Sequence, residues 1–174
     1  MFFLMKFIKD VTVSPADLSK DLKKILKLKL LEYTSGTVHP EYGYFIKIIT
    51  IYDENVRTGL IMEGSGDIIF KLEYDVLVMR PFEGEVAEGI IDNVFDVGGF
   101  LVNVGPMKIF ISKDDISENY ALDKNNLCYK NERNDTELKK GTKIRFRYKA
   151  TQFKDGDFKP TGTIRDNYLG YIDD

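Results

Sequence analysis

The spacing of hydrophobic and polar positions changes several times along this chain, and each change marks a predicted element. The opening residues, MFFLMKFI, are mostly apolar and predict a first strand. Apolar residues in the next segment recur three and four positions apart, which is the spacing of one helix face. They are Leu18, Leu22, Ile25, Leu26, Leu30 and Tyr33. The pattern therefore predicts a strand followed by one helix.

The ends of this helix carry suitable capping residues. Ser14 is predicted as the N-cap and Pro15 as the first helical residue, and Gly36 lies just beyond the end. Leu28 and Leu31 lie outside the apolar stripe. Two interpretations stay open for this pair: a helix with a wide buried face, or a second apolar strip that contacts another protein.

Strand patterns dominate residues 43–79. GYFIKIITIY is rich in aromatic and β-branched residues, TGLIM follows it, and EGSGD has the glycines of a turn. In IIFKLEYDVLVM, apolar and charged residues alternate, as in a strand with one buried face. Residues 1–80 are thus predicted to form an α+β domain in which the helix packs on an antiparallel sheet.

A second domain is predicted over residues 81–174. Pro81 and Gly84 interrupt the strand pattern at RPFEGEV, and five short strand candidates follow. They are EVAEGIIDNVF, GFLVNV, MKIFIS, TKIRFRYKA and KPTGTIRD, with a long polar insert between the third and the fourth. Five short strands without a strong helix predict an all-β closed barrel, because closure removes exposed strand edges.

The composition excludes most kinds of active site. Cys128 and His39 are the only residues of their types, so we expect no disulfide within the chain and no Cys/His zinc site. Neither common glycine-rich phosphate motif is present, and we expect no cofactor and no metal. One enzyme hypothesis is a hydrolase built on Asp114 and Asp115, but adjacent acids of this kind usually just face water. No apolar run is long enough for a membrane span, so no membrane contact is expected.

A net charge of −3 gives no reason to expect tight, nonspecific nucleic-acid binding, so such binding would need a local patch. The first candidate patch is a row of cations in TKIRFRYKA: Lys143, Arg145, Arg147 and Lys149. They alternate with apolar residues, which places all four on one face of a strand. Two interpretations stay open: a stripe that contacts phosphates, or a solvated face whose cations pair with nearby acids.

The second candidate patch lies in MKIFIS. If Ile109 and Ile111 are core residues, Phe110 is an exposed aromatic ring beside the cation of Lys108, a pairing that suits a stacked base and its phosphate. Phe100 shares a face with Val102 in a regular strand, which favours a core position unless the preceding glycines introduce a bulge.

These residues resemble the S1 domain, an RNA-binding version of the five-stranded OB barrel. The resemblance rests on VFDVGGFLVNVG followed by KIFIS. It implies that the glycines allow a sharp bend and that Phe100 and Phe110 occupy two base-stacking positions. Two positions depart from the family pattern: Val97 stands where many S1 domains have an aromatic residue, and Phe110 where many have histidine. Weaker RNA binding than in the best members is therefore expected.

A second resemblance covers nearly the whole chain. The order of short fragments is similar to the stalk-subunit family of RNA polymerases, which includes the seventh subunit of polymerase II, its archaeal homologue, and the counterparts in polymerases I and III. The fragments are MFF, the Ser-Pro turn into a helix with KLLE, EYGY, GSGDIIF, RPFEGEV, VGPMKIFIS, LCYKN and DNYLGYI. VGPM and YLG favour the polymerase II member, whereas GTKIRFR is also similar to the polymerase III member.

The stalk-subunit resemblance implies a non-catalytic, nuclear subunit with two domains. Residues 1–80 would form a truncated RNP-like domain that pairs with the fourth subunit of RNA polymerase II and docks near the polymerase clamp through its tip. The tip residues by position are Pro15, Glu63, Gly64, Ser65 and Gly66. The S1 domain would meet single-stranded RNA leaving the enzyme. The alternatives are the polymerase III stalk subunit and a free S1-type RNA-binding protein.

Overall fold

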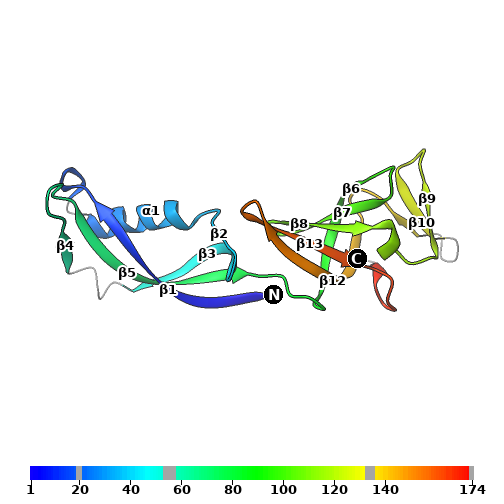
Figure 1. Cartoon of the computed structure of the whole chain (residues 1–174), viewed down its shortest axis with the longest axis horizontal. Helices are drawn as coiled ribbons and strands as arrows, with labels where there is room; N and C mark the ends of the chain where they lie inside the picture. The colour runs from blue at the N-terminus through cyan, green and yellow to red at the C-terminus, as the bar shows by residue number, and fades with distance from the viewer. Residues whose placement is uncertain (19–20, 53–57, 132–135, 173–174) are drawn as a thin grey trace. The chain divides into compact units, whose positions relative to one another are not determined.

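The computed structural model describes residues 1–18, 21–52, 58–131 and 136–172 (Figure 1). Contacts between its residues divide the chain into two compact units, one from Phe2 to Arg80 and one from Pro81 to Asp174 together with Met1. Within the described ranges, no helix is long and apolar enough to cross a membrane.

The first unit is an antiparallel sheet with one α-helix against it, α1 (Leu22–Thr34). The strands are β1 (Phe2–Val13), β2 (Val38–His39), β3 (Gly43–Tyr52), β4 (Gly59–Ile61) and β5 (Ile68–Met79). β5 is the central strand, since β1 pairs with one edge of it and β3 and β4 with the other. The predicted helix on an antiparallel sheet is confirmed.

Alternation along β5 explains how this sheet acquires its buried face. Phe70, Leu72 and Tyr74 are buried, whereas the charged residues between them point to the opposite face. α1 contributes Leu26 and Leu30, both almost completely buried, to the same core. The alternation in the sequence predicted this strand correctly.

The helix is shorter than predicted. Ser14 does cap a helical turn, since its Oγ accepts a hydrogen bond from the Ala16 amide at 3.4 Å, but that turn is the 3₁₀ helix η1 (Pro15–Asp17). Leu18 has extended backbone angles and ends η1. α1 then begins separately at Leu22. The prediction of one continuous helix starting at Pro15 was therefore wrong, because the Ser-Pro cap signal belongs to a local turn.

The apolar stripe of the helix is also narrower than predicted. Leu18 and Tyr33, which were expected on the buried face, are exposed. Leu28 and Leu31 are exposed as well, so the interpretation of a wide buried face was wrong. The helix packs through its centre and leaves apolar side chains outside the core.

Two β-bulges interrupt β3. Its register against β5 shifts between Phe45 and Lys47 and again between Ile48 and Thr50. A bulge adds one unpaired residue and bends the strand, so the inward residues fall every third position instead of every second. They are Phe45, Ile48 and Ile51, which pack against the core. Regular strand alternation could not predict this arrangement.

The second unit contains a closed five-stranded barrel. Its strands are β6 (Val86–Val94), β7 (Gly99–Val104), β8 (Met107–Ser112), β12 (Lys143–Lys154) and β13 (Asp157–Thr163). They follow the order β13-β8-β7-β6-β12, and pairing of β12 with β13 closes the ring. β14 (Gly170–Tyr171) pairs with β12. The predicted all-β OB-type barrel is confirmed.

The polar insert has structure of its own. After the 3₁₀ helix η3 (Lys113–Asp115), a small antiparallel sheet forms from three short strands. They are β9 (Tyr120–Asp123), β10 (Cys128–Asn131) and β11 (Glu137–Leu138). Sequence analysis had predicted no strands in this insert.

Candidate nucleic-acid interface

The β7–β8 hairpin provides the strongest candidate surface, and glycines determine its shape. The turn between the strands contains Gly105 with φ of 56°, a left-handed conformation that glycine adopts without strain. At the other end of β7, Gly99 has φ of 114°, and a Cβ there would lie 2.7 Å from the carbonyl oxygen of Ile111. Only glycine therefore fits at Gly99, which explains part of the glycine-rich pattern in the sequence.

Tyr129 of β10 fixes the start of this hairpin. Its hydroxyl accepts a hydrogen bond from the Gly99 amide at 2.6 Å, and the tyrosine is buried. The Tyr129 ring also meets the Phe100 ring edge to face, with centroids 5.9 Å apart. Through Tyr129, the insert thus stabilises the β7–β8 hairpin. Sequence reasoning quoted LCYKN but missed this role, because no local pattern links residues 30 positions apart.

One face of the hairpin forms an exposed aromatic and cationic surface. Leu101 lies opposite Phe110, and Asn103 lies opposite Lys108, all directed outward. Phe110 is 38% exposed, and the half-buried ring of Phe95 lies 6.3 Å from it, centroid to centroid. We call Phe95, Leu101, Lys108 and Phe110 the hairpin platform. It offers an aromatic face beside a cation, the arrangement that single-stranded RNA requires for stacking and phosphate contact.

Lys108 is only loosely paired. Its Nζ lies 3.5 Å from a carboxylate oxygen of Asp92, and its side chain is exposed. Exposed ion pairs of this kind contribute little, typically about 0–1 kcal/mol, so a phosphate can compete for the ammonium group. Lys108 and Phe110 lie together as the sequence predicted.

Phe100 does not lie on this surface. Its ring has no exposed area, because β7 runs without a bulge through Phe100 and directs it into the barrel with Val102. A base cannot stack on a ring that solvent does not reach. The S1 resemblance implied a base-stacking position for Phe100; we assign it to the core instead.

The row of cations on β12 is accompanied by acids. The four side chains share one outward face, as the alternation predicted. Each has a carboxylate partner: Lys143 and Arg145 pair with Glu88, Arg147 with Asp166, and Lys149 with Asp115. Hydrogen bonds from Arg145 to Glu88 lower the pKa of that carboxyl below its ordinary value. This geometry is that of the solvated, ion-paired face, one of the two interpretations left open.

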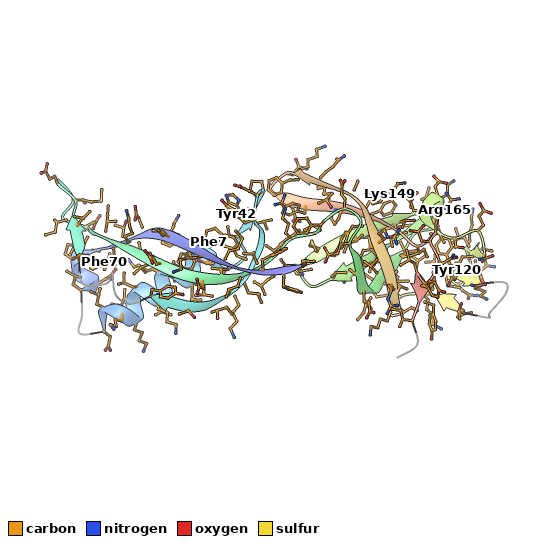
Figure 2. All side chains as sticks on the ribbon, turned by 90° about the horizontal axis from the view of Figure 1, so that it is seen from below. Phe7, Tyr42, Phe70, Tyr120, Lys149 and Arg165 are labelled. Carbon is orange, nitrogen blue, oxygen red and sulfur yellow. The ribbon has the colours of Figure 1, made fainter. Side chains whose placement is uncertain are left out.

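The partners of these cations come from distant parts of the chain. Lys149, labelled in Figure 2, reaches from β12 to Asp115 of η3, with 2.8 Å between Nζ and Oδ1. Sequence reasoning could not identify the pairs, since acids are abundant and the fold alone decides which of them faces β12.

The predicted tip residues of the first unit lie together. A Cβ placed on Gly66 would lie 3.9 Å from the Pro15 ring, so η1 and the turn of Glu63, Gly64, Ser65 and Gly66 are neighbours. The turn is closed by a hydrogen bond from the Met62 amide to the Asp67 carbonyl at 2.7 Å.

Three apolar residues missed by sequence reasoning extend this region. Leu60 and Ile61 are 75% and 72% exposed, and Met62 is exposed beside them. TGLIM was interpreted as an ordinary strand, whereas β4 is a three-residue strand with every residue exposed. We call Pro15, Leu60, Ile61, Met62 and the Glu63–Gly66 turn the tip cluster. Contiguous exposed apolar side chains often mark a protein contact.

Among the described residues, no group of three or more His, Cys, Asp or Glu side chains is placed to hold a metal ion. Cys128 is buried, and burial raises the pKa of its thiol, which keeps it protonated and unreactive.

Comparison with known proteins agrees with this geometry. Residues 80–150 match the S1 RNA binding domain. The chain is 29% identical to the DNA-directed RNA polymerase II subunit rpb7 of Dictyostelium discoideum, over 99% of each chain. It is 28% identical to the corresponding subunit of Saccharomyces cerevisiae, over 99% of this chain and 100% of that one.

Two further similarities are partial. The chain is 30% identical to DNA-directed RNA polymerase IV subunit 7 of Arabidopsis thaliana over 63% of each chain. Among solved structures, the apo form of Mycoplasma genitalium RNase R matches 46% of this chain and 13% of that one, with a TM-score of 0.37 and 14% identity.

Proposed function

We propose that this chain, a relative of the seventh subunit of RNA polymerase II along nearly its whole length, is a non-catalytic stalk subunit of that nuclear polymerase. Similarity over 99% of both chains carries the proposal, because it includes both units and not the S1 match alone. Catalysis then belongs to other subunits of the complex.

Three contacts follow from this proposal. Residues 1–80 act as an RNP-like tip domain that forms a heterodimer with the fourth subunit and docks near the clamp. The tip cluster supports the docking contact, because it gathers exposed apolar side chains around the predicted tip residues. Residues 81–174 act as an S1/OB domain that contacts emerging RNA, and the hairpin platform supports that contact.

Copurification tests the polymerase role. The tagged chain is recovered from native extract and its partners are identified by mass spectrometry. We expect the polymerase II large subunits and a fourth-subunit partner. Recovery of polymerase III subunits would reassign the chain to that enzyme's stalk, and ribosomal proteins alone would leave a free S1-type protein.

A variant of the tip cluster tests, in the same copurification experiment, whether docking uses this surface. Leu60→Asp with Ile61→Asp places charges in the tip cluster at positions that solvent already reaches, so folding should be retained. We expect at least a tenfold lower recovery of the large subunits relative to the unmodified chain. The matched control, Val97→Asp with Tyr168→Asp, changes two exposed apolar residues of the second unit and should leave recovery unchanged. Equal recovery with the tip variant would contradict docking through this cluster.

RNA binding is tested on the hairpin platform. Lys108→Ala with Phe110→Ala should weaken binding of single-stranded RNA at least several-fold, because stacking on an aromatic ring is worth about 1–3 kcal/mol per base. Fluorescence anisotropy with a labelled oligonucleotide measures the affinity at several salt concentrations. Unchanged affinity in the folded variant would remove both residues from the RNA surface.

The β12 cations provide the matched control. Arg145→Gln with Arg147→Gln removes two positive charges that already have acidic partners. We expect the salt dependence of RNA binding to stay as it is. A slope reduced by roughly 1.4, about 0.7 for each phosphate that is no longer neutralised, would instead include Lys143, Arg145, Arg147 and Lys149 in the RNA surface.

A further inference from the structure

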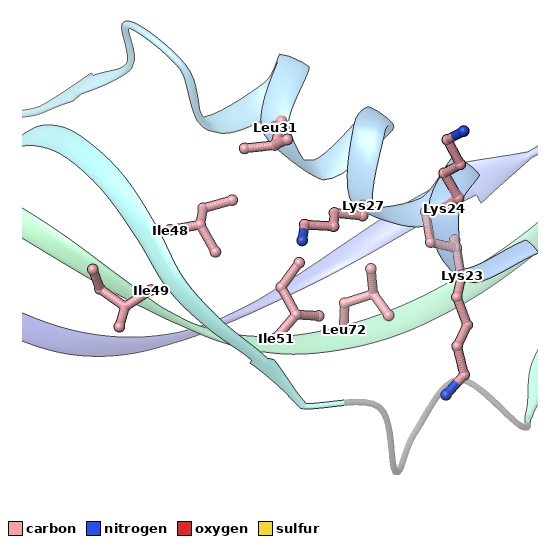
Figure 3. A pocket seen from close by; sticks show the side chains of 9 residues that line it. Lys23, Lys24, Lys27, Leu31, Ile48, Ile49, Ile51 and Leu72 are labelled. Atoms are coloured by element: carbon pink, nitrogen blue, oxygen red, sulfur yellow. The ribbon is translucent and has the colours of Figure 1, made fainter.

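A groove of about 400 Å³ lies between α1 and β3 in the first unit (Figure 3). Among the described residues, its walls combine aliphatic and cationic side chains and include no aromatic ring. The lining residues are Lys23, Lys24, Leu26, Lys27, Leu31, Ile48, Ile49, Ile51 and Leu72.

The aliphatic residues form a floor and a rim. Leu26 and Leu72 are buried, and Ile48 and Ile51 pack partly against the same core. Higher on the walls, Leu31 is 37% exposed and Ile49 is 52% exposed. Apolar surface therefore continues from the core to solvent through the groove, and these side chains remain accessible to a partner.

Two of the α1 lysines that line the groove, Lys24 and Lys27, give it positive charge. Figure 3 shows the Lys27 side chain reaching from α1 toward Ile48 and Ile51. Neither Lys24 nor Lys27 forms an ion pair with a carboxylate anywhere in the described part of the first unit. The β12 cations differ, because each of those has an acidic partner. Charge complementarity therefore favours an anionic ligand at the groove.

The exposed edge of β3 indicates whether that ligand is an added strand or a helix. Within the described residues, β3 pairs with β2 only at Tyr44 and Gly43, so its later residues form a sheet edge beside the groove. Ile46 and Ile49 are the extra residues of the two bulges, and bulges disfavour addition of a further strand. A helix that inserts side chains needs no edge hydrogen bonds and avoids this obstacle.

We propose that the groove binds an amphipathic helix of a partner protein, with aliphatic side chains on its inner face and Asp or Glu on its flanks. The aliphatic residues would enter between α1 and β3, and the acids would meet Lys24 and Lys27. Nucleic acid fits less well, because no aromatic ring offers a stacking surface. This contact is independent of polymerase membership, so either can fail in experiment while the other stands.

Peptide binding to the full-length chain tests the proposal. The probes are fluorescent 20-residue helical peptides with leucines three and four positions apart and glutamates on both flanks. Matched peptides carry lysine in place of each glutamate. We expect the acidic peptides to bind at least tenfold more tightly than the basic ones in anisotropy titrations, and to shift the methyl NMR signals of Leu31 and Ile48.

Variants locate the contact. Lys24→Glu with Lys27→Glu should weaken binding of the acidic peptides at least tenfold, and Leu31→Asp should do so at an already exposed position. The control, Lys47→Glu with Lys71→Glu, makes the same charge change on the opposite face of the sheet, where Lys47 lies opposite Leu77 and Lys71 opposite Asp10. It should leave affinity unchanged.

Three results would overturn the proposal. The first is failure of every acidic peptide to bind. The second is an equal loss of affinity in the control variant, which would indicate nonspecific charge attraction. The third is a Lys24→Glu, Lys27→Glu variant that binds single-stranded RNA more weakly but binds the acidic peptides as before. That result would indicate that the groove contacts nucleic acid.

Discussion

The Tyr129 hydroxyl is a single polar atom that stabilises the start of β7, the strand that carries part of the hairpin platform. It is the partner of the Gly99 amide, and that amide lies where a strand begins in a left-handed conformation. A buried amide without a partner is costly. The shape of the hairpin platform thus depends on a residue that is not part of the platform.

Removing this hydroxyl should destabilise the second unit. Tyr129→Phe keeps the ring but leaves the Gly99 amide unpaired, at a cost of about 1–3 kcal/mol in the free energy of unfolding. Urea denaturation measures the change. Tyr168→Phe, at a side chain that is 94% exposed, is the control and should be neutral. Equal stability of the two variants would mean that the hydrogen bond contributes nothing.

Single residues differ in how well the sequence predicted them. Alternation alone directed Phe110 outward and Ile109 inward, because a strand has only two faces. It could not predict that Arg147 pairs with Asp166, since such a pair depends on the closure of the barrel. Side-chain direction is local information, whereas electrostatic partners are not.

At the scale of elements, one acidic side chain, Asp123, makes several contacts at the turn of the β9–β10 hairpin. Asp123 accepts hydrogen bonds from the side chain and amide of Asn126 and from the amide of Asn125, and it pairs with Lys130 at 3.2 Å. The side-chain hydrogen bond from Asn126, followed by that from Lys130, lowers the pKa of Asp123 to about 2.

This lowered pKa predicts a pH-dependent stability. The charged form is favoured in the folded chain, so the stabilisation is complete above the ordinary pKa of 3.8 and disappears as the pH falls to about 2. Asp123→Ala should therefore lower the thermal midpoint at pH 7, and the difference from the unmodified chain should shrink between about pH 4 and about pH 2.

Thermal unfolding followed by circular dichroism at several pH values measures this effect. Asp96→Ala removes an exposed carboxylate and serves as the control. If the difference in thermal midpoint between Asp123→Ala and the unmodified chain stays constant down to about pH 2, the Asp123 charge does not stabilise the hairpin.

Elements were predicted well where their pattern was regular. β5 alternates over its full length and was predicted correctly, whereas the two bulges of β3 changed its period and left Ile46 and Ile49 on the edge. The Ser14 cap was a genuine local signal, but it could not indicate how far the following helical turn would extend.

At the scale of the whole molecule, each unit buries its own core. The core of the first unit is formed by α1, β1, β3 and β5, and that of the second by residues such as Phe100, Ile109 and Phe146. The order of fragments along the sequence indicated both units, because that order reflects the whole chain. It could not predict the groove beside α1, which depends on the β3 bulges.

Because each unit has its own core, a core substitution should destabilise only the unit that contains it. Leu30→Ala in α1 and Ile109→Ala in β8 each remove fully buried atoms and should cost about 2–5 kcal/mol. Hydrogen exchange measured by mass spectrometry should show faster exchange within residues 2–80 for the first variant and within residues 81–174 for the second. Uniformly faster exchange in both variants would indicate that the chain unfolds as one unit.

The pairing of β1 with β5 has a consequence for biosynthesis. Phe2 pairs with Met79 and Val13 with Ile68, so β1 leaves the ribosome well before β5, the strand with which it pairs. At about 5–20 residues per second, that wait lasts roughly 4–15 s. Through this interval the nascent chain carries β1 as an unpaired, largely apolar strand, and any slowing of translation between Val13 and Ile68 lengthens the time during which it can aggregate.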